Sequence, residues 1–145
     1  LEEPLLGPKL RAIKEACDGD VGVFEGWGGM YLPELIDSGI DGVMPGLGHA
    51  DAIHALWSAA QAGNLDGSLD IFEHLLPHIS FSLQNLELYL YVEKQLLLAR
   101  GIIRHAHVRA ITATPDEQTV AHAEILNRRV LKLVEELNLP IQPVK

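Results

Sequence analysis

The sequence predicts an α/β fold in which two parallel strand–helix units are followed by about four helices. Two short apolar runs, at 21–24 and 41–44, each lead into a glycine-containing turn, and a helix-like stretch at about 30–37 separates them. Strands joined by a helical crossover run parallel in one sheet. From residue 50 onward the apolar residues follow helical spacing and no strand signal remains. In such folds the chemistry lies at the carboxyl ends of the strands, here Gly26 and Met44 to Gly46.

Each element of the first part has a local signal. A helix is expected to open at Gly7-Pro8, because proline costs no hydrogen bond at the first helical position, and to end at 18–20. Val21–Phe24 is predicted to be a fully buried strand and Asp41–Met44 the second strand. The helix between them, from about Met30 to Asp37, is stopped by Ser38-Gly39.

The second part reads as helices. Apolar spacing predicts a helix over 53–63 and another from Leu69 to Ile79 that Pro77 ends or kinks. The stretch 83–99 is apolar on several faces, so it is expected to be buried among other helices. A last helix is expected to begin with Thr114 as N-cap and Pro115 in its first position, and to bury the stripe Ala123, Leu126, Val130, Leu133 and Leu137.

Composition excludes several classes of protein. The chain has 145 residues, 48% of them hydrophobic, and a formal net charge of -9, which argues against nucleic acid or an anionic membrane as a partner. The single cysteine, Cys17, rules out an internal disulfide and is typical of a reducing compartment. No apolar run approaches the roughly 18 residues of a membrane span, and the first residues lack the features of a signal peptide. We expect a cytoplasmic protein.

Two parallel strands do not make a stable sheet, because their outer edges would expose unpaired backbone groups. We therefore expect further strands, upstream or on a partner chain. The alternative is that the helices cover a very small sheet.

The residues also resemble a known family. Residues 23–29 (Val-Phe-Glu-Gly-Trp-Gly-Gly) and 39–46 (Gly-Ile-Asp-Gly-Val-Met-Pro-Gly) resemble the seventh and eighth strands of the dihydrodipicolinate synthase / N-acetylneuraminate lyase family. Downstream, residues 62–66 (Ala-Gly-Asn-Leu-Asp) resemble a helix turn of that family. Its later signature is matched by Lys94, Leu97 and Arg100-Gly101, then Val108-Arg109. One departure is Ala110-Ile111, where the family usually has a proline near that arginine.

The resemblance implies a C-terminal fragment of a (β/α)8 TIM barrel, 1–63, followed by an α-helical C-terminal domain, 64–145. A whole barrel needs roughly 250 residues. The family is implied to make or break a carbon–carbon bond next to pyruvate or a related 2-oxo acid. A lysine of the sixth strand forms a Schiff base with the keto carbon, which then acts as an electron sink.

The same resemblance implies a small-molecule 2-oxo acid as partner, no cofactor, and a homo-oligomer when the protein is complete. One alternative is a dehydratase or hydratase-aldolase of the same family, acting on a sugar acid or an aromatic 2-oxo acid. Another is a non-catalytic helical interaction module on a remnant scaffold.

Lys14 resembles the Schiff-base lysine but has the wrong spacing. Ile13-Lys14-Glu15 is similar to the family's motif, yet only six residues separate Lys14 from Val21, whereas a crossover needs about a dozen. Lys14 is therefore expected on a helix, as a solvated surface lysine. Leu1 to Pro4 resemble the loop directly after the sixth strand, so the nucleophile is expected just before Leu1. We predict no catalytic residue in this chain, which would be inactive alone.

The substrate-binding candidates are Met44, Gly26, Gly46 and Trp27. Met44 matches the position whose backbone lines the pyruvate pocket in the family, while its side chain alone reads as a core methionine. Gly26 matches the glycine that ends the seventh strand, where it either allows close approach of a ligand or serves only as a turn. Trp27 could stack on the acceptor, although a packing tryptophan is commoner. Sialic acid lyases carry acidic residues where this chain has Gly28 and Gly29, which disfavours a sialic acid substrate.

Other polar residues carry weaker hypotheses. Glu25 is either a general acid or base or a polar residue facing a helix. The seven histidines suggest a metal, but Pro77 disturbs the pair His74 and His78, and His105-Ala-His107 lies in a linker. No carboxylate or cysteine completes a recognisable ligand set, so we expect no metal site. Gly46-Leu-Gly48 lacks the third glycine of a dinucleotide fingerprint.

Overall fold

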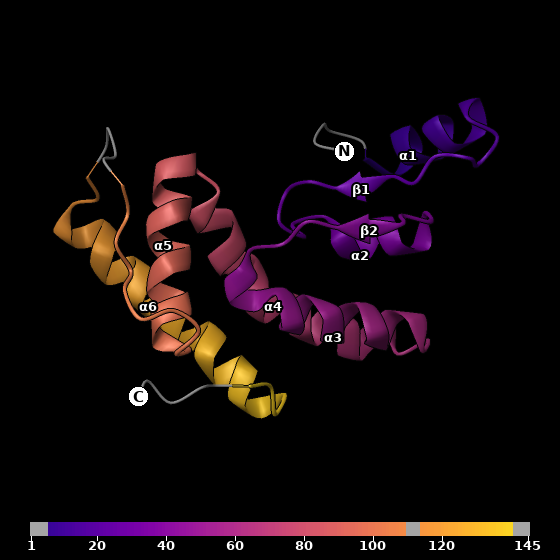
Figure 1. The fold of residues 1–145 in the computed structure, drawn as a ribbon. Coiled ribbons are helices and arrows are strands. Elements are labelled where there is room, and N and C mark those ends of the chain that lie inside the picture. The colour runs from indigo at the N-terminus through magenta and orange to yellow at the C-terminus, as the bar shows by residue number, and fades with distance from the viewer. Residues whose placement is uncertain (1–5, 110–113, 141–145) are drawn as a thin grey trace.

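A computed structural model describes residues 6–109 and 114–140 of the protein. A two-stranded sheet lies among the helices of the first half, and four α-helices follow it along the described chain (Figure 1). The elements in chain order are α1 (Leu6–Ala16), β1 (Phe24–Glu25), α2 (Leu32–Asp37), β2 (Gly42–Val43), a 3-10 turn η1 (Leu47–His49), α3 (Ala50–Gln61), α4 (Leu65–Ser82), α5 (Leu86–Ala99) and α6 (Glu117–Glu136).

The two strands pair in parallel, as predicted, with Phe24 opposite Gly42 and Glu25 opposite Val43. They are shorter than expected, and the prediction of a fully buried first strand is wrong. Val21 and Phe24 are about half exposed, whereas Val23 and Glu25 are buried. Side chains alternate across a strand, so only every second one faces the helices, and the described residues leave the other face open. Further strands stay a prediction.

The flanking helices of the first half are confirmed with shifted ends. α1 begins two residues before Pro8 and ends where Asp18 and Gly19 adopt positive φ, the left-handed conformation that ends many helices. α2 begins two residues later than predicted, with proline in its first turn, and is followed by Gly39, also at positive φ. The residues before Leu6, including the loop expected after a sixth strand, lie outside the described part of the chain, as does the departure at Ala110-Ile111.

Two predictions about the middle helices are corrected. α4 runs on through Pro77, because its buried residues Ile71, Leu75 and Ile79 hold it in the core while Pro77 itself is exposed. α5 begins only at Leu86, where the side chain of Asn85 accepts a hydrogen bond from Leu88 N at 2.7 Å. Leu86 is 71% exposed, so α5 is not buried on all sides.

The start of α6 also differs from the prediction. Asp116, not Thr114, is the N-cap: its Oδ1 accepts a hydrogen bond from Thr119 N at 2.8 Å. Aspartate and threonine both favour the N-cap position, and the helix begins after the later of the two. The predicted stripe is largely confirmed, since Ala123, Leu126, Val130 and Leu133 are buried and Leu137 packs beside them.

One hydrophobic cluster connects the two halves of the chain. It includes Leu10 of α1, Leu35 of α2, Leu56 of α3, Leu75 of α4 and Val130 of α6. The division into a barrel part and a helical domain therefore stays a prediction. In the described ranges, no helix combines the length and apolarity that crossing a bilayer requires.

Candidate functional site

The carboxyl ends of β1 and β2 lie side by side, which places Gly26 and Met44 at one edge of the sheet. The ladder continues beyond the strands, because Met44 N donates to Glu25 O at 2.9 Å. Parallel register alone brings these two predicted residues together although 18 positions separate them in sequence.

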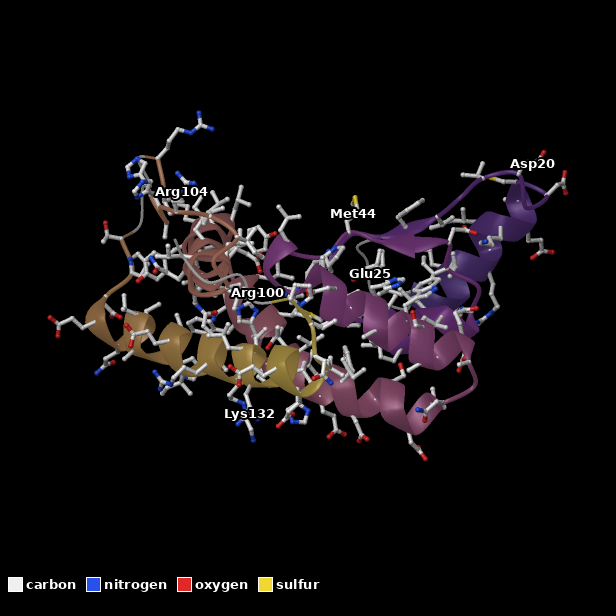
Figure 2. The ribbon with its side chains drawn as sticks, turned by 60° about the horizontal axis from the view of Figure 1, so that its bottom comes forward. Asp20, Glu25, Met44, Arg100, Arg104 and Lys132 are labelled. Atoms are coloured by element: carbon white, nitrogen blue, oxygen red, sulfur yellow. The ribbon has the colours of Figure 1, made fainter. Side chains whose placement is uncertain are left out.

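Side-chain alternation gives the sheet two different faces. Glu25 is buried and Val43 packs against the core, whereas Phe24 covers Gly42 on the opposite face. Met44 is 59% exposed and points away from the helices (Figure 2). Reading Met44 as a core methionine is therefore wrong for the described structure. Phe24 and Met44 form an open apolar face.

The Trp27 side chain is partly packed against its neighbours and partly exposed. Its ring centroid is 6.2 Å from that of Tyr31, and the side chain is 39% exposed. Gly26 and Trp27 also line a cavity of about 270 Å³, which is completed by Leu83 and Asn85 of the α4–α5 turn and by Leu86 and Tyr89 of α5. Stacking of Trp27 on a ligand stays a prediction, and this cavity is where it would occur.

The backbone structure explains why glycines follow Trp27. Gly28 and Gly29 both have positive φ, and a Cβ on Gly29 would lie 2.9 Å from Ile53 Cδ1 in the core. Backbone conformation and close packing therefore account for both, independently of any substrate.

Glu25 faces the helices, as one of its two readings predicted. Its Oε2 accepts a hydrogen bond from Gly29 N at 2.7 Å, which closes the loop after β1, and its Oε1 has no hydrogen-bond partner. Burial raises the pKa of the Glu25 carboxyl, and the bond from Gly29 opposes part of this rise. Because Glu25 points away from the open face, it orders the loop instead of reaching a ligand there.

Lys14 lies on α1 as predicted, but it is paired instead of fully solvated. Its Nζ lies 2.8 Å from the carboxylate of Asp41, whose Oδ2 also accepts from Val23 N at 2.7 Å. The hydrogen bond from Lys14 holds the pKa of Asp41 below its usual value. Asp41 immediately precedes β2, so Lys14 lies at the amino end of the strands, opposite the edge of Gly26 and Met44.

Two charged residues, Glu93 of α5 and its C-cap Arg100, hold the loop after β2, and sequence reasoning missed this role for both. Glu93 Oε2 accepts from Gly48 N at 2.9 Å, and Arg100 Nη1 donates to Gly48 O at 2.7 Å. They are seven residues apart, two helical turns, and so share a face of α5. Gly46 is buried under the Glu93 carboxylate, which a Cβ there would strike. Gly46 thus admits Glu93, and its contact with a ligand stays a prediction.

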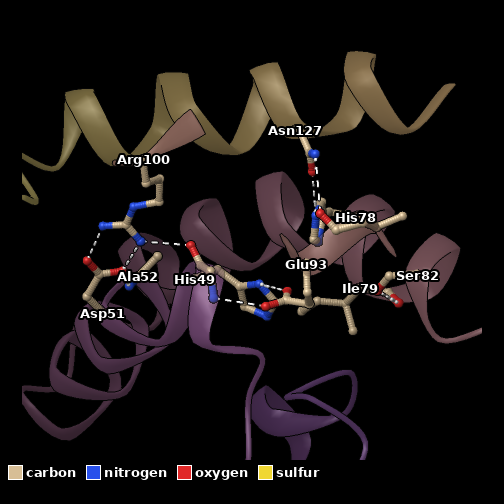
Figure 3. A network of polar contacts seen from close by, with 11 residues as sticks. His49, Asp51, Ala52, His78, Ile79, Ser82, Glu93, Arg100 and Asn127 are labelled. Carbon is tan, nitrogen blue, oxygen red and sulfur yellow. Dashed lines mark hydrogen bonds and ion pairs between the residues drawn. The ribbon is translucent and has the colours of Figure 1, made fainter. Parts of the chain in front are cut away.

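Arg100 also pairs with Asp51 in the first turn of α3 (Figure 3). Its guanidinium donates to both carboxylate oxygens of Asp51 and to Pro140 O at 2.9 Å. Burial alone would raise the pKa of Asp51, but the hydrogen bonds and charge of Arg100 outweigh it and lower that pKa. A signal was present in the sequence: Leu88, Val92, Leu96 and Arg100 recur every four residues, so Arg100 continues a buried apolar stripe.

Distant segments bring two histidines and a carboxylate together. His49 precedes α3, His78 lies on α4 and Glu93 on α5, and all three are buried. Spacing along the sequence did not indicate this grouping, in which Glu93 lies beside His49 and His78, and the expectation of no metal site stays a prediction. His74 is exposed on the same helix as His78, and His105 and His107 are exposed in the segment after α5.

Comparison with known proteins supports the fold alone. No protein-family model matches the sequence, and no curated protein matches it. Among solved structures, dihydrodipicolinate synthase from Rhodopseudomonas palustris superposes with a TM-score of 0.77 at 22% sequence identity. The match covers 89% of this chain and 44% of that one. The chain therefore shares its fold with part of that synthase and spans less than half of its length.

Proposed function

We propose that this chain is the C-terminal portion of a Schiff-base (class I) aldolase, lyase or synthase that acts next to a 2-oxo acid such as pyruvate. The observation that carries the proposal is the fold shared with part of a dihydrodipicolinate synthase. The juxtaposition of Gly26 and Met44 at the carboxyl edge of parallel strands supports it, since α/β folds bind ligands at this edge.

Met44 has a narrower role than strand position alone suggests. Its N–H already donates to Glu25 O, so it is not available to a substrate carboxylate. We assign to Met44 an apolar wall of the site, formed by its exposed side chain, and to Gly26 the close approach of a ligand. Trp27 borders the adjoining cavity, where an acceptor would bind.

We propose that the Schiff-base lysine lies outside the described residues, whose lysines are Lys9, Lys14, Lys94 and Lys132. Lys14 lies at the wrong edge of the sheet, Lys94 donates to His107 O at 2.6 Å, and Lys132 pairs with Glu136 at 3.4 Å. None of these three reaches the carboxyl edge. A lysine just before Leu1 is the one that the family resemblance favours.

Borohydride trapping tests the proposal. The full-length gene product is treated with pyruvate and sodium borohydride, and the adduct is read by intact mass and then located by peptide mapping. We expect one reduced pyruvate per chain, on a lysine other than the described Lys9, Lys14, Lys94 and Lys132. The matched control K14R should retain the adduct in full.

No adduct, or an adduct that K14R abolishes, would contradict this assignment. Absence of an adduct would favour the non-catalytic helical module. A dehydratase or hydratase-aldolase of the same type would form the adduct too, and its product would distinguish it.

A further inference from the structure

The buried cluster of His49, His78 and Glu93 has the chemistry of a metal site. Each residue offers one nitrogen or oxygen atom, and these three atoms all lie within 4.8 Å of one another. The three residues are between 1% and 4% exposed, so the cluster lies in the interior (Figure 3). It contacts the loop at the carboxyl edge of the strands through Glu93, which accepts from Gly48 N, and shares no residue with the Arg100–Asp51 pair.

His78 and Glu93 each have one side-chain polar atom in a hydrogen bond and a second polar atom without a partner. His78 Nε2 lies 2.9 Å from Asn127 Oδ1, and Asn127 Nδ2 in turn donates to Val92 O at 3.4 Å. This arrangement makes His78 Nε2 the donor and leaves a lone pair on His78 Nδ1, which has no hydrogen-bond partner. Glu93 Oε2 is engaged by Gly48 N, and its Oε1 likewise has none.

His49 supplies the third group. Its Nδ1 lies 3.3 Å from Glu93 Oε1 without hydrogen-bond alignment, and its ring packs edge-on to that of His78, with centroids 5.4 Å apart. Neither ring nitrogen of His49 has a hydrogen-bond partner. Buried polar atoms are normally satisfied, so four unpartnered atoms on three adjacent side chains point to a missing ligand.

The chemistry of these atoms selects a cation. A carboxylate and two imidazole lone pairs repel an anion and offer an apolar molecule nothing, whereas they are common ligands of divalent metals. A metal binds the lone pair of a neutral imidazole, and the contact of His78 Nε2 with Asn127 Oδ1 leaves that lone pair on Nδ1. The anchoring of His78 by Asn127 matches the way outer partners orient metal-bound histidines.

We propose that His49, His78 and Glu93 bind one divalent transition-metal ion, zinc before others. Two histidines and one glutamate are a known zinc ligand set, with a fourth position for water. The three ligands come from three separate elements of the fold. The ion would connect η1 with α4 and α5, and so order the loop of Gly46 and Gly48 at the carboxyl edge.

Metal binding by the full-length protein tests the proposal. The protein is stripped with chelator, dialysed against zinc in slight excess, and analysed for zinc per chain. We expect one zinc per chain in the wild type and a raised melting temperature on loading. H74Q, which changes an exposed histidine one turn before His78, is the matched control and should bind as the wild type does.

Ligand variants should lose zinc in graded steps. N127A, which removes the partner of His78, is expected to weaken zinc binding about 10–100-fold. E93Q and H78Q remove a ligand and should weaken it further. E93Q keeps an oxygen that can accept from Gly48 N, so circular dichroism should show it folded.

A measurement on the wild type alone covers the case in which the variants fail to fold. X-ray absorption of the zinc-loaded protein should report two imidazole nitrogens at about 2.0–2.1 Å. Less than one zinc per chain at saturation, a spectrum without imidazole, or folded ligand variants that bind like H74Q would overturn the proposal. The cluster would then be a buried histidine–carboxylate pair.

Discussion

Replacing Arg100 with methionine should remove the main polar connection between α5 and the loop after β2. Arg100 is 1% exposed and donates to Asp51, Gly48 O and Pro140 O. Methionine retains apolar packing along the stem but has no donor. Removal of one partner of a buried ion pair costs about 3–5 kcal/mol of unfolding free energy. Because the Asp51 side chain is 33% exposed, water solvates part of the carboxylate, and we expect a loss near the lower end, about 3 kcal/mol.

Urea unfolding followed by circular dichroism measures this loss. R104M is the matched control, since Arg104 is exposed and four residues further along, and it should stay within about 0.5 kcal/mol of the wild type. R100K should recover little, because a single ammonium cannot bridge both carboxylate oxygens.

A double-mutant cycle isolates the pair itself. R100M, D51N and the double variant should show a coupling energy of about 0.5–3 kcal/mol. Equal stability of R100M and R104M, or strict additivity of R100M and D51N, would refute the reasoning from burial and bidentate geometry.

Three further predictions concern pH, packing and capping. Since the pKa of Asp51 is lowered in the folded protein, its stabilisation is present above its unfolded value of 3.8 and lost as pH falls through the folded pKa. Thermal unfolding at decreasing pH should therefore show a shallower acid loss for D51N than for the wild type, and parallel curves would exclude Asp51 as a source. G29A and G39A both force an alanine to positive φ, which should cost about 1–2 kcal/mol of unfolding free energy each. A Cβ on Gly29 would also lie 2.9 Å from Ile53 Cδ1 in the core, whereas a Cβ on Gly39 meets no atom within 4 Å. Urea unfolding should therefore find G29A less stable than G39A. D116A should cost about 1 kcal/mol in the same assay and T114A under about 0.5, whereas the reverse order would restore Thr114 as the N-cap of α6.

The strand order and the buried stripe of α6 could be predicted, because each depends on residues that are close in the sequence. The parallel order of β1 and β2 follows from two apolar runs joined by a helix, and the stripe of α6 from its spacing. Element ends were less accurate. Asp116 and Thr114 are both good caps, Asn85 is a further cap inside an apolar stretch, and only packing selects among such candidates.

In the candidate site, too, one feature could be predicted from the sequence and another could not. Gly26 and Met44 meet at one edge because parallel register requires it, which sequence order alone implies. The exposure of Met44 was not predictable, since it depends on which face of the sheet the helices cover.

The sequence by itself determined the alternation of short strands and helices, the spacing that removes Lys14 from the nucleophile's position, and a resemblance that the shared fold supports. Only the tertiary structure placed Glu93 at the N–H and Arg100 at the C=O of Gly48, and His49 and His78 beside Glu93. The physical reason is distance along the chain. Local hydrogen bonding and periodicity act over a few residues, whereas His49, His78 and Glu93 come from three elements that meet only when α3, α4 and α5 pack.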